Sequence, residues 1–152
     1  MIEIENQKQN MFNQESRHSM MQKSILIASY DQNIFDTLSR NLHELDYDIR
    51  FAQRGVKVLN EILDGNVELL ILDVELAGMM GIELLPVIKK IRPRLSVILI
   101  TDDLNRRIRQ IAAEEGVVYQ AQKPMTPQES NSITRVAEKI IDRLYELQHI
   151  AV

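Results

Sequence analysis

The stretch LLILDVELAGMMG at residues 69–81 decides the fold of this chain. Its first four residues form an uninterrupted apolar run, which is typical of a parallel strand buried on both faces. Asp73 ends that run and a glycine-containing turn follows, so the carboxylate is expected at the carboxyl end of the strand. Open α/β sheets place their ligands and their chemistry at that edge. Asp73 is therefore the first candidate functional residue.

Two further segments bring polar groups to the same edge of the predicted sheet. The apolar run 97–100 ends in Thr101, and a third segment ends in Lys123-Pro124. The carboxyl ends of parallel strands meet at one edge, so these groups are expected close to Asp73. Three strand ends therefore offer a carboxylate, a hydroxyl and an ammonium group.

The composition limits the classes of protein to consider. The chain has 152 residues with 45% apolar and 26% charged residues, as expected for one globular domain. A net charge of −4 gives no general attraction to nucleic acid or to an anionic membrane. Cysteine is absent, which excludes disulfides and thiolate chemistry and fits a cytoplasmic location. No apolar stretch approaches the ~20 residues that span a bilayer.

The chain divides into an extension and one domain. Residues 1–23 are rich in Gln, Asn, Glu, Ser and Met and show little apolar period, which predicts a flexible N-terminal extension. Two alternatives stay open. The segment forms a short helix that docks on a partner, or it lies outside the natural product, with Met20 or Met21 as the start. Residues 24–150 are predicted to form the domain, with an extended C-terminal helix.

Strands and helices alternate from Ser24 onward. Strands are predicted at 25–28, 47–52, 69–72, 96–100 and 117–121, and helices at 32–45, 56–63, 82–91, 104–115 and from 127 toward 148. Five β-α units imply a parallel sheet with helices on both faces, and right-handed crossovers leave few topologies. The predicted fold class is a flavodoxin-like α/β domain, a doubly wound (βα)5 parallel sheet with strand order 2-1-3-4-5.

With this pattern, the chain resembles the receiver domain of bacterial two-component response regulators over about residues 24–147. The residues that carry the resemblance are Asp73 with the loop 76–81, Thr101, and Lys123 with Pro124. A lone Asp, Thr or Lys-Pro pair is a weak signal, whereas their order, spacing and strand-end positions together are specific. The resemblance implies a signalling function and no enzyme activity.

The resemblance also implies a role for each residue. Asp73 is the phosphoacceptor, which receives a phosphoryl group from a histidine kinase or a small phosphodonor. Lys123 pairs with the phosphoryl oxygens, and the Thr101 hydroxyl bonds the phosphoryl group and moves with it. In the family, an acidic pair after the first strand, the acceptor Asp and a backbone carbonyl two residues beyond it hold Mg²⁺. That carbonyl corresponds to Glu75, and the metal neutralises the charge that phosphoryl transfer concentrates.

The metal ligands depart from the family pattern. The acidic pair maps to Ser29 and Tyr30, and neither residue is a strong Mg²⁺ ligand. Asp31 lies one position further on and contributes to a metal site only if its loop shifts. The sequence therefore predicts a Mg²⁺ site that has lost two ligands.

The residue at the switch position and the charge around the site also differ from the family pattern. The aromatic switch residue of the family maps to Gln120, with Tyr119 beside it. Glu75, Asp102 and Asp103 add negative charge where an anionic phosphodonor would approach. Each change should weaken Mg²⁺-dependent phosphorylation or its readout.

A purely structural role competes for each candidate. Asp73 and Lys123 form a salt bridge at the sheet edge in the alternative without phosphorylation. Thr101 then only ends a strand, and Lys123-Pro124 is a common loop pair. Asp102 and Asp103 then cap the following helix, which its dipole favours.

One surface is a candidate for contacts with partners. The predicted helix 104–115 carries Arg106, Arg107 and Arg109. In receivers, the face built from this helix, the following strand and the last helix commonly meets partners or a second copy. A homodimer through this face is therefore one expectation, and a solvated basic face is the alternative. The apolar excess of the last helix could pack on the extension, a second copy or a partner.

Three functions compete at this stage. The first is a receiver in a phosphorelay, and the second is a pseudo-receiver that binds a histidine kinase or another signalling protein. The third is an enzyme or small-ligand binder, which lacks support because no glycine-rich phosphate loop follows the first strand. No DNA-binding helix-turn-helix is expected after the domain. The sequence favours an atypical receiver with compromised phosphorylation.

Overall fold

The computed structural model describes residues 22–102 and 106–150, with side chains through His149. The predicted N-terminal extension lies outside the described residues except for Gln22 and Lys23. Asp103 and the predicted start of its helix also lie outside them.

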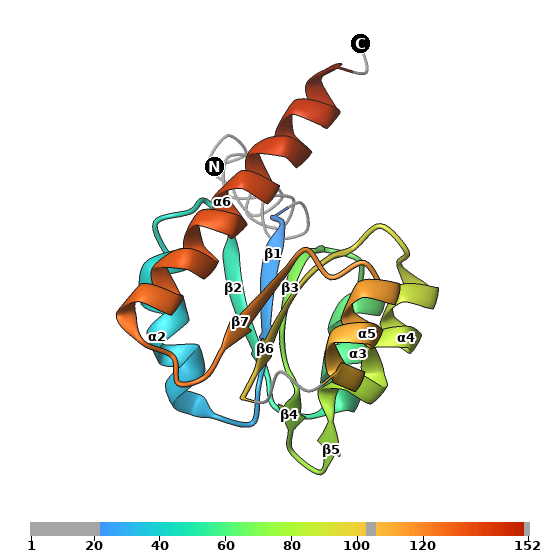
Figure 1. Ribbon diagram of the computed structural model, residues 1–152. Coiled ribbons are helices and arrows are strands. Elements are labelled where there is room, and N and C mark those ends of the chain that lie inside the picture. Colours follow the sequence, from blue (N-terminus) through green and yellow to red (C-terminus); the bar gives the residue numbers. More distant parts are fainter. Residues whose placement is uncertain (1–21, 103–105, 151–152) are drawn as a thin grey trace, which may run out of the picture.

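A parallel sheet of five strands forms the centre of the molecule, in the order β2-β1-β3-β6-β7 (Figure 1). The strands are β1 (Ser24–Ala28), β2 (Asp48–Ala52), β3 (Val67–Asp73), β6 (Ser96–Thr101) and β7 (Tyr119–Gln122). This order is the predicted 2-1-3-4-5 arrangement, because β4 and β5 belong to a separate small hairpin. The flavodoxin-like fold class and its topology are confirmed.

Helices cover both faces of the sheet, as Figure 1 shows. They are α2 (Gln32–Leu42), α3 (Gly55–Leu63), α4 (Gly81–Ile91), α5 (Arg106–Glu114) and α6 (Pro127–Ile150). Alternate residues of each strand enter opposite cores. Ile25 and Ile27 of β1 pack with the residues of α2 and α6, whereas Leu26 and Ala28 pack with those of α3, α4 and α5. Burial on both faces explains why the central strands β1, β3 and β6 contain continuous apolar runs.

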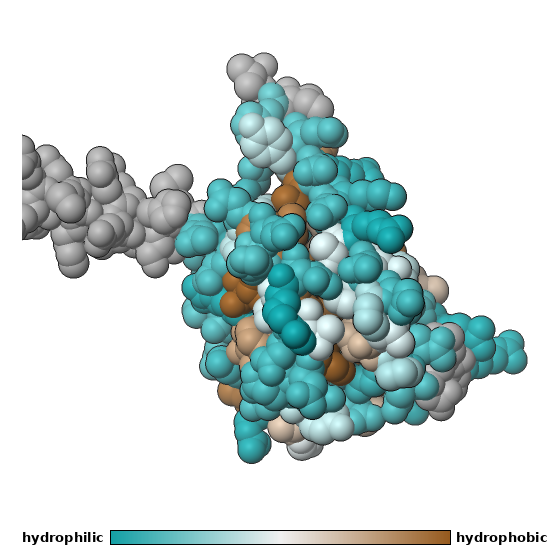
Figure 2. Space-filling model, turned by 90° about the vertical axis from the view of Figure 1, so that its left-hand side faces the viewer, coloured by the Kyte–Doolittle hydropathy of each residue, from teal (hydrophilic) through white to brown (hydrophobic). Residues whose placement is uncertain are grey.

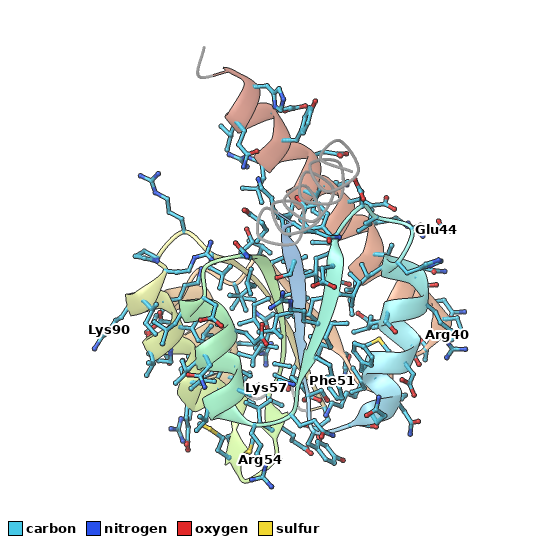
Figure 3. All side chains as sticks on the ribbon, turned by 180° about the vertical axis from the view of Figure 1, so that it is seen from behind. Arg40, Glu44, Phe51, Arg54, Lys57 and Lys90 are labelled. Carbon is cyan, nitrogen blue, oxygen red and sulfur yellow. The ribbon has the colours of Figure 1, made fainter. Side chains whose placement is uncertain are left out.

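The outer surfaces of the helices are charged, and one aromatic pair lies near the sheet edge. Arg40 on α2 and Lys90 on α4 point away from the sheet on opposite sides of the molecule (Figure 3). Phe51 of the edge strand β2 stacks on Phe35 of α2, with ring centroids 4.5 Å apart. This stack anchors the partly exposed edge strand to the helix beside it.

The register of the sheet aligns the strand ends that carry polar residues. Ala28 pairs with Leu72 of β3, so Ser29 follows β1 beside Asp73. Asp73 pairs with Ile100 of β6, and Thr101 pairs with Gln122 of β7. The carboxyl edge of the sheet therefore gathers the polar residues that the sequence placed at strand ends.

A small hairpin that the sequence did not predict connects β3 to α4. Its strands are β4 (Glu75–Leu76) and β5 (Met79–Met80), and Gly78 turns between them with a φ of +81°. Two-residue strands are too short to leave a periodic pattern. The hairpin ends at Gly81, whose backbone N–H donates to the Val74 carbonyl 2.6 Å away. A methyl group at Gly81 would collide with the backbone carbonyl of Asp73.

Replacing Gly81 with alanine is expected to lower the free energy of unfolding by roughly 2 kcal/mol or more, because backbone must move to admit the methyl group. Gly55→Ala is the matched control, since Gly55 also begins a helix and its added methyl would meet the side-chain sulfur of Met79. A flexible Met side chain can move aside, so the control should change stability little. Urea unfolding of both variants checks this, and equal losses would contradict it.

Several predicted boundaries were wrong, including the start of β3, which lies at Val67 instead of residue 69. The helix predicted to reach residue 45 ends at Leu42, and a turn follows in which the Leu45 N–H donates to the Leu42 carbonyl. Leu45 still packs on the core, which explains its helix-like spacing. The last strand begins at Tyr119 instead of residue 117, because the Val117 N–H donates to Ala112 and closes the end of α5.

The last helix extends past the amino edge of the sheet, opposite the Asp73 edge (Figure 1). Ile133 and Ala137 are fully buried against the sheet, whereas Tyr145 and Leu147 are 61% and 57% exposed. We call the segment from Ile141 to His149 the α6 stem. Within the described part of the chain, no helix has both the length and the apolar character needed to cross a bilayer.

Candidate functional site

The carboxylate of Asp73 is the centre of the candidate site. Asp73 ends β3 and is fully buried. Its Oδ1 accepts hydrogen bonds from the Lys123 ammonium at 2.9 Å and from the Glu75 backbone N–H at 3.0 Å. Its Oδ2 accepts a hydrogen bond of 2.7 Å from the Ser29 hydroxyl. Both carboxylate oxygens are therefore bound by donors of the protein itself.

Ser29 links the first strand to this carboxylate. It follows β1 and is 1% exposed, and its backbone N–H extends the β1–β2 ladder by donating to the Ala52 carbonyl. While its hydroxyl donates to Asp73, its oxygen accepts the Asp31 backbone N–H at 3.0 Å. The backbone hydrogen bond to Ala52 and the two hydrogen bonds of the hydroxyl together fix the position of Ser29. In the part of the chain that the structure describes, every buried side-chain N or O atom has a hydrogen-bond partner.

Lys123 supplies the positive charge of the site. Burial lowers the pKa of its ammonium, but the hydrogen bond and charge of Asp73, with the charges of Glu75 and Asp102, outweigh burial and leave the pKa raised. A raised lysine pKa means that this stabilisation is fully present below the unfolded value of about 10.4 and is lost as the pH rises through the folded value. The ion pair is therefore intact at neutral pH.

Tyr30 lies over the same ammonium. Its ring is 5.7 Å from the Lys123 Nζ, and the residue is 49% exposed. An aromatic face within about 6 Å attracts a cation. The ring therefore contributes to holding Lys123 beside Asp73.

The residues present do not fit the Mg²⁺ site that the resemblance implies. Ser29 donates its hydroxyl to the Asp73 oxygen, and the Tyr30 backbone N–H donates to the Glu75 carbonyl at 3.2 Å. The Asp31 carboxylate accepts the Asn33 N–H at 2.9 Å and caps α2. Among the residues described, no group of three His, Cys, Asp or Glu side chains could hold a metal ion. Hydrogen bonds thus stand where Mg²⁺ would need free oxygen ligands.

A hollow of about 490 Å³ opens beside Lys123. Its walls come from the start of α2 and from the loops after β6 and β7, and they include Asp31, Asn33, Asp102, Lys123 and Pro124. One ammonium group and two carboxylates line this hollow. The surroundings of Lys123, the ion partner of Asp73, are therefore predominantly anionic, which disfavours an anionic phosphodonor.

Thr101 is brought to the site and is fully buried at the end of β6. Its carbonyl accepts the Lys123 backbone N–H at 2.9 Å, so the loop that carries the ammonium is tied to this strand end. Asp102 follows it and is exposed. Asp73, Thr101 and Lys123 are therefore neighbours, as the sequence suggested.

The residues proposed for a switch and a partner face lie away from the carboxylate. The Tyr119 hydroxyl donates to Glu129 of α6 at 3.2 Å, and its ring packs on the core under α6. Burial, then the charge of Glu129, raises the pKa of Tyr119. Gln120 alternates to the side of the sheet that α5 covers. Arg106, Arg107 and Arg109 are all exposed on α5.

Comparison with known proteins identifies the family. The response regulator receiver domain family matches residues 25–135, which is more than half of the chain. The chain belongs to this family. The receiver is similar to the DNA-binding transcriptional regulator NtrC of Azospirillum brasilense, with 30% identity over 118 residues that cover 78% of this chain and 24% of the relative.

Other relatives agree with this assignment. The transcriptional regulatory protein PhoP of Bacillus subtilis is 26% identical over 112 residues, which cover 74% of the receiver and 47% of PhoP. The chain therefore spans about a quarter to a half of the length of these curated relatives. A CheY-like receiver domain from Methanospirillum hungatei superimposes with a TM-score of 0.70 at 26% identity, covering 82% of this chain and 98% of that one.

A structure from Vibrio parahaemolyticus supports the fold alone. The receiver domain of its putative LuxO repressor superimposes with a TM-score of 0.74 at 18% identity and covers 86% of this chain and 98% of that one. The receiver assignment and the order of its strands thus rest on both sequence and structure.

Sequence reasoning missed the role of Ser29 in this receiver. Ser29 was interpreted only as a lost metal ligand, whereas the structure shows it as a hydrogen-bond donor to Asp73. The signal was available, because the order 2-1-3 makes the first and third strands neighbours, and a hydroxyl beside a buried carboxylate is a natural donor. The contact between Tyr30 N–H and the Glu75 carbonyl left no such signal, since it is made by backbone atoms.

Proposed function

We propose that this protein is an atypical receiver of two-component signalling, with Asp73 as the phosphoacceptor and with compromised Mg²⁺-dependent phosphorylation. The single observation that supports this is the engagement of both Asp73 oxygens, by Ser29 on one side and by Lys123 with the Glu75 N–H on the other. Phosphoryl transfer forms a bond between phosphorus and one carboxylate oxygen while the bond to the donor breaks. That oxygen must first lose its hydrogen bond.

Charge adds a second barrier to the transfer. In the ordinary reaction, Mg²⁺ draws the anionic donor toward the anionic carboxylate and neutralises the charge that develops. Here Lys123 is the cation beside Asp73, and Asp31, Glu75 and Asp102 surround it with negative charge. Lys123 would bind the phosphoryl oxygens, and Thr101, at the neighbouring strand end, would contribute its hydroxyl.

A second candidate function is a phosphorylation-independent pseudo-receiver that acts as a protein-interaction module. The face of α5, β7 and α6 favours it, because Arg106, Arg107 and Arg109 are exposed there and Tyr119 is held by Glu129. A histidine kinase, another signalling protein or a second copy is the partner we propose for this face. Its state would be set by that partner and not by the Asp73 site.

Intact-mass analysis after incubation with acetyl phosphate, with and without Mg²⁺, tests the proposal. We expect little or no gain of a phosphoryl group under conditions that label an ordinary receiver fully. Asp73→Asn is the control for the site of any label. A complete gain that requires both Mg²⁺ and Asp73 would show an ordinary phosphoacceptor and contradict the proposal.

A further inference from the structure

A second hollow lies at the end of the molecule opposite Asp73. It measures about 400 Å³ and is bounded by Gln22 and Lys23 before β1, by Asp46 and Tyr47 before β2, and by Ile141 and Tyr145 of the α6 stem. Figure 2 shows hydrophobic side chains among hydrophilic ones where the protruding helix meets the body. The hollow therefore combines apolar walls with a charged rim.

The hollow is built largely from parts of the chain outside the family match. That match covers residues 25–135, whereas Gln22 and Lys23 precede it and Ile141 and Tyr145 follow it. Ile141 packs on the core of the sheet, whereas Tyr145 is more than half exposed. Segments from opposite ends of the sequence thus meet at one place on the surface.

The stem has apolar side chains and no sheet beneath it. Tyr145 and Leu147 are more than half exposed, whereas Leu144 is half-buried and borders a separate hollow with Glu68 and Leu95. The stem is thus the least supported part of α6, and most helical stability in proteins comes from packing an apolar face. An apolar segment that covers the hollow would stabilise the stem.

We propose that the occupant of this hollow is the chain's own N-terminal segment, residues 1–21. The segment continues directly from Gln22, which is itself part of the hollow wall. It carries Met11 and Phe12, and Phe12 precedes Gln22 by ten residues. Ten residues reach at most about 35 Å, and the stem from Ile141 to His149 is only about 12 Å long, so Phe12 can reach any part of it.

Covalent attachment favours this segment over a second copy. A tethered group meets its site at an effective concentration in the mM range, whereas a separate molecule must bind at its own concentration. The attached segment, with Met11 and Phe12 as its apolar groups, is therefore favoured over an unattached one with similar contacts.

Paramagnetic relaxation in the full-length protein tests this docking. Because the chain contains no cysteine, Ser16→Cys provides one attachment point for a nitroxide label. We expect the label to remove amide signal from Tyr47, Ile141 and Tyr145, and reduction of the nitroxide to restore it. A label at Val56→Cys, on an exposed position at the start of α3, is the control and should leave these amides unchanged.

Two variants probe the contact from both sides. Phe12→Ser removes the aromatic group of the segment. Tyr145→Ser removes a wall of the hollow, and because Tyr145 is 61% exposed, the fold is expected to remain intact. Each should restore the amide signals. Loss of signal that arises only between molecules, in a mixture of nitroxide-labelled and isotope-labelled protein, would overturn the proposal in favour of a second copy. Absence of any signal loss would overturn it as well.

Discussion

The double substitution Ser29→Asp with Tyr30→Asp is expected to create a Mg²⁺ site where the native chain has hydrogen bonds. The Ser29 hydroxyl lies 2.7 Å from an Asp73 oxygen, so a carboxylate at position 29 would be close enough to bind the same metal ion as Asp73. Without metal, two neighbouring buried carboxylates repel each other, and the variant should be less stable than the native protein by several kcal/mol. With Mg²⁺, the three carboxylates supply the oxygen ligands that the ion prefers.

Thermal unfolding at increasing Mg²⁺ concentration measures this effect. A ligand that binds only the folded state stabilises it by about 2.7 kcal/mol at a concentration of 100 times Kd, so the midpoint of the double variant should rise with Mg²⁺. The native protein should show no comparable rise. Ser29→Asn with Tyr30→Asn is the matched control, since it has similar side-chain size without the charges. An equal response of the native protein to Mg²⁺ would show that our account of the site is wrong.

Replacing Lys123 with methionine is expected to cost about 3–5 kcal/mol of unfolding free energy, because it leaves the buried Asp73 carboxylate without its ion partner. Asp73 is fully buried and its Oδ1 lies 2.9 Å from the Lys123 ammonium. Methionine keeps most of the length of the side chain, so the loss reports mainly on charge. Lys90→Met on the exposed surface of α4 is the control and should have little effect.

Urea unfolding at neutral pH checks this loss, and a second variant separates charge from packing. Asp73→Asn combined with Lys123→Met removes both charges and should recover a large part of the stability, since no unpaired buried charge remains. In such a double-mutant cycle, the stability losses of the two single variants are not expected to add, because the two groups are in direct contact. A double variant as unstable as the sum of the single ones would indicate that the pair does not interact.

The arrangement of the sheet could be predicted because burial on both faces leaves a strong signal. Residues 69–72 of β3 and 97–100 of β6 are all apolar, and the polar residue that follows each run marks the carboxyl edge. The hairpin at Glu75–Leu76 and Met79–Met80 could not be predicted, because it consists of local backbone hydrogen bonds without apolar alternation. The end of α2 was misplaced for a different reason, since Leu45 contacts the core from a turn.

The sequence predicted which residues form the candidate site better than it predicted the hydrogen bonds between them. Asp73, Thr101 and Lys123 meet as expected, and the salt bridge considered as an alternative is present. The hydrogen bond of Ser29 was accessible from the predicted strand order, because β1 and β3 are neighbours in it. The contact of Tyr30 was not, because a backbone N–H makes it. Spacing along one strand is visible in a sequence, whereas distances between strands follow only from the fold.

The alternation of β7 has a consequence that a single-codon deletion would reveal. Tyr119 stands an even number of residues before Lys123 and packs beneath α6, while Gln120 stands an odd number before it and faces the other side. Deletion of one codon between Tyr119 and Lys123 would reverse this parity and place the phenol ring on the side of the sheet that α5 covers. There the ring would have to fit against Ile108 and Ala112, the buried residues of α5, because the arginines of that helix face solvent. A single-residue deletion would therefore move an aromatic ring from one core to the other without changing any residue type.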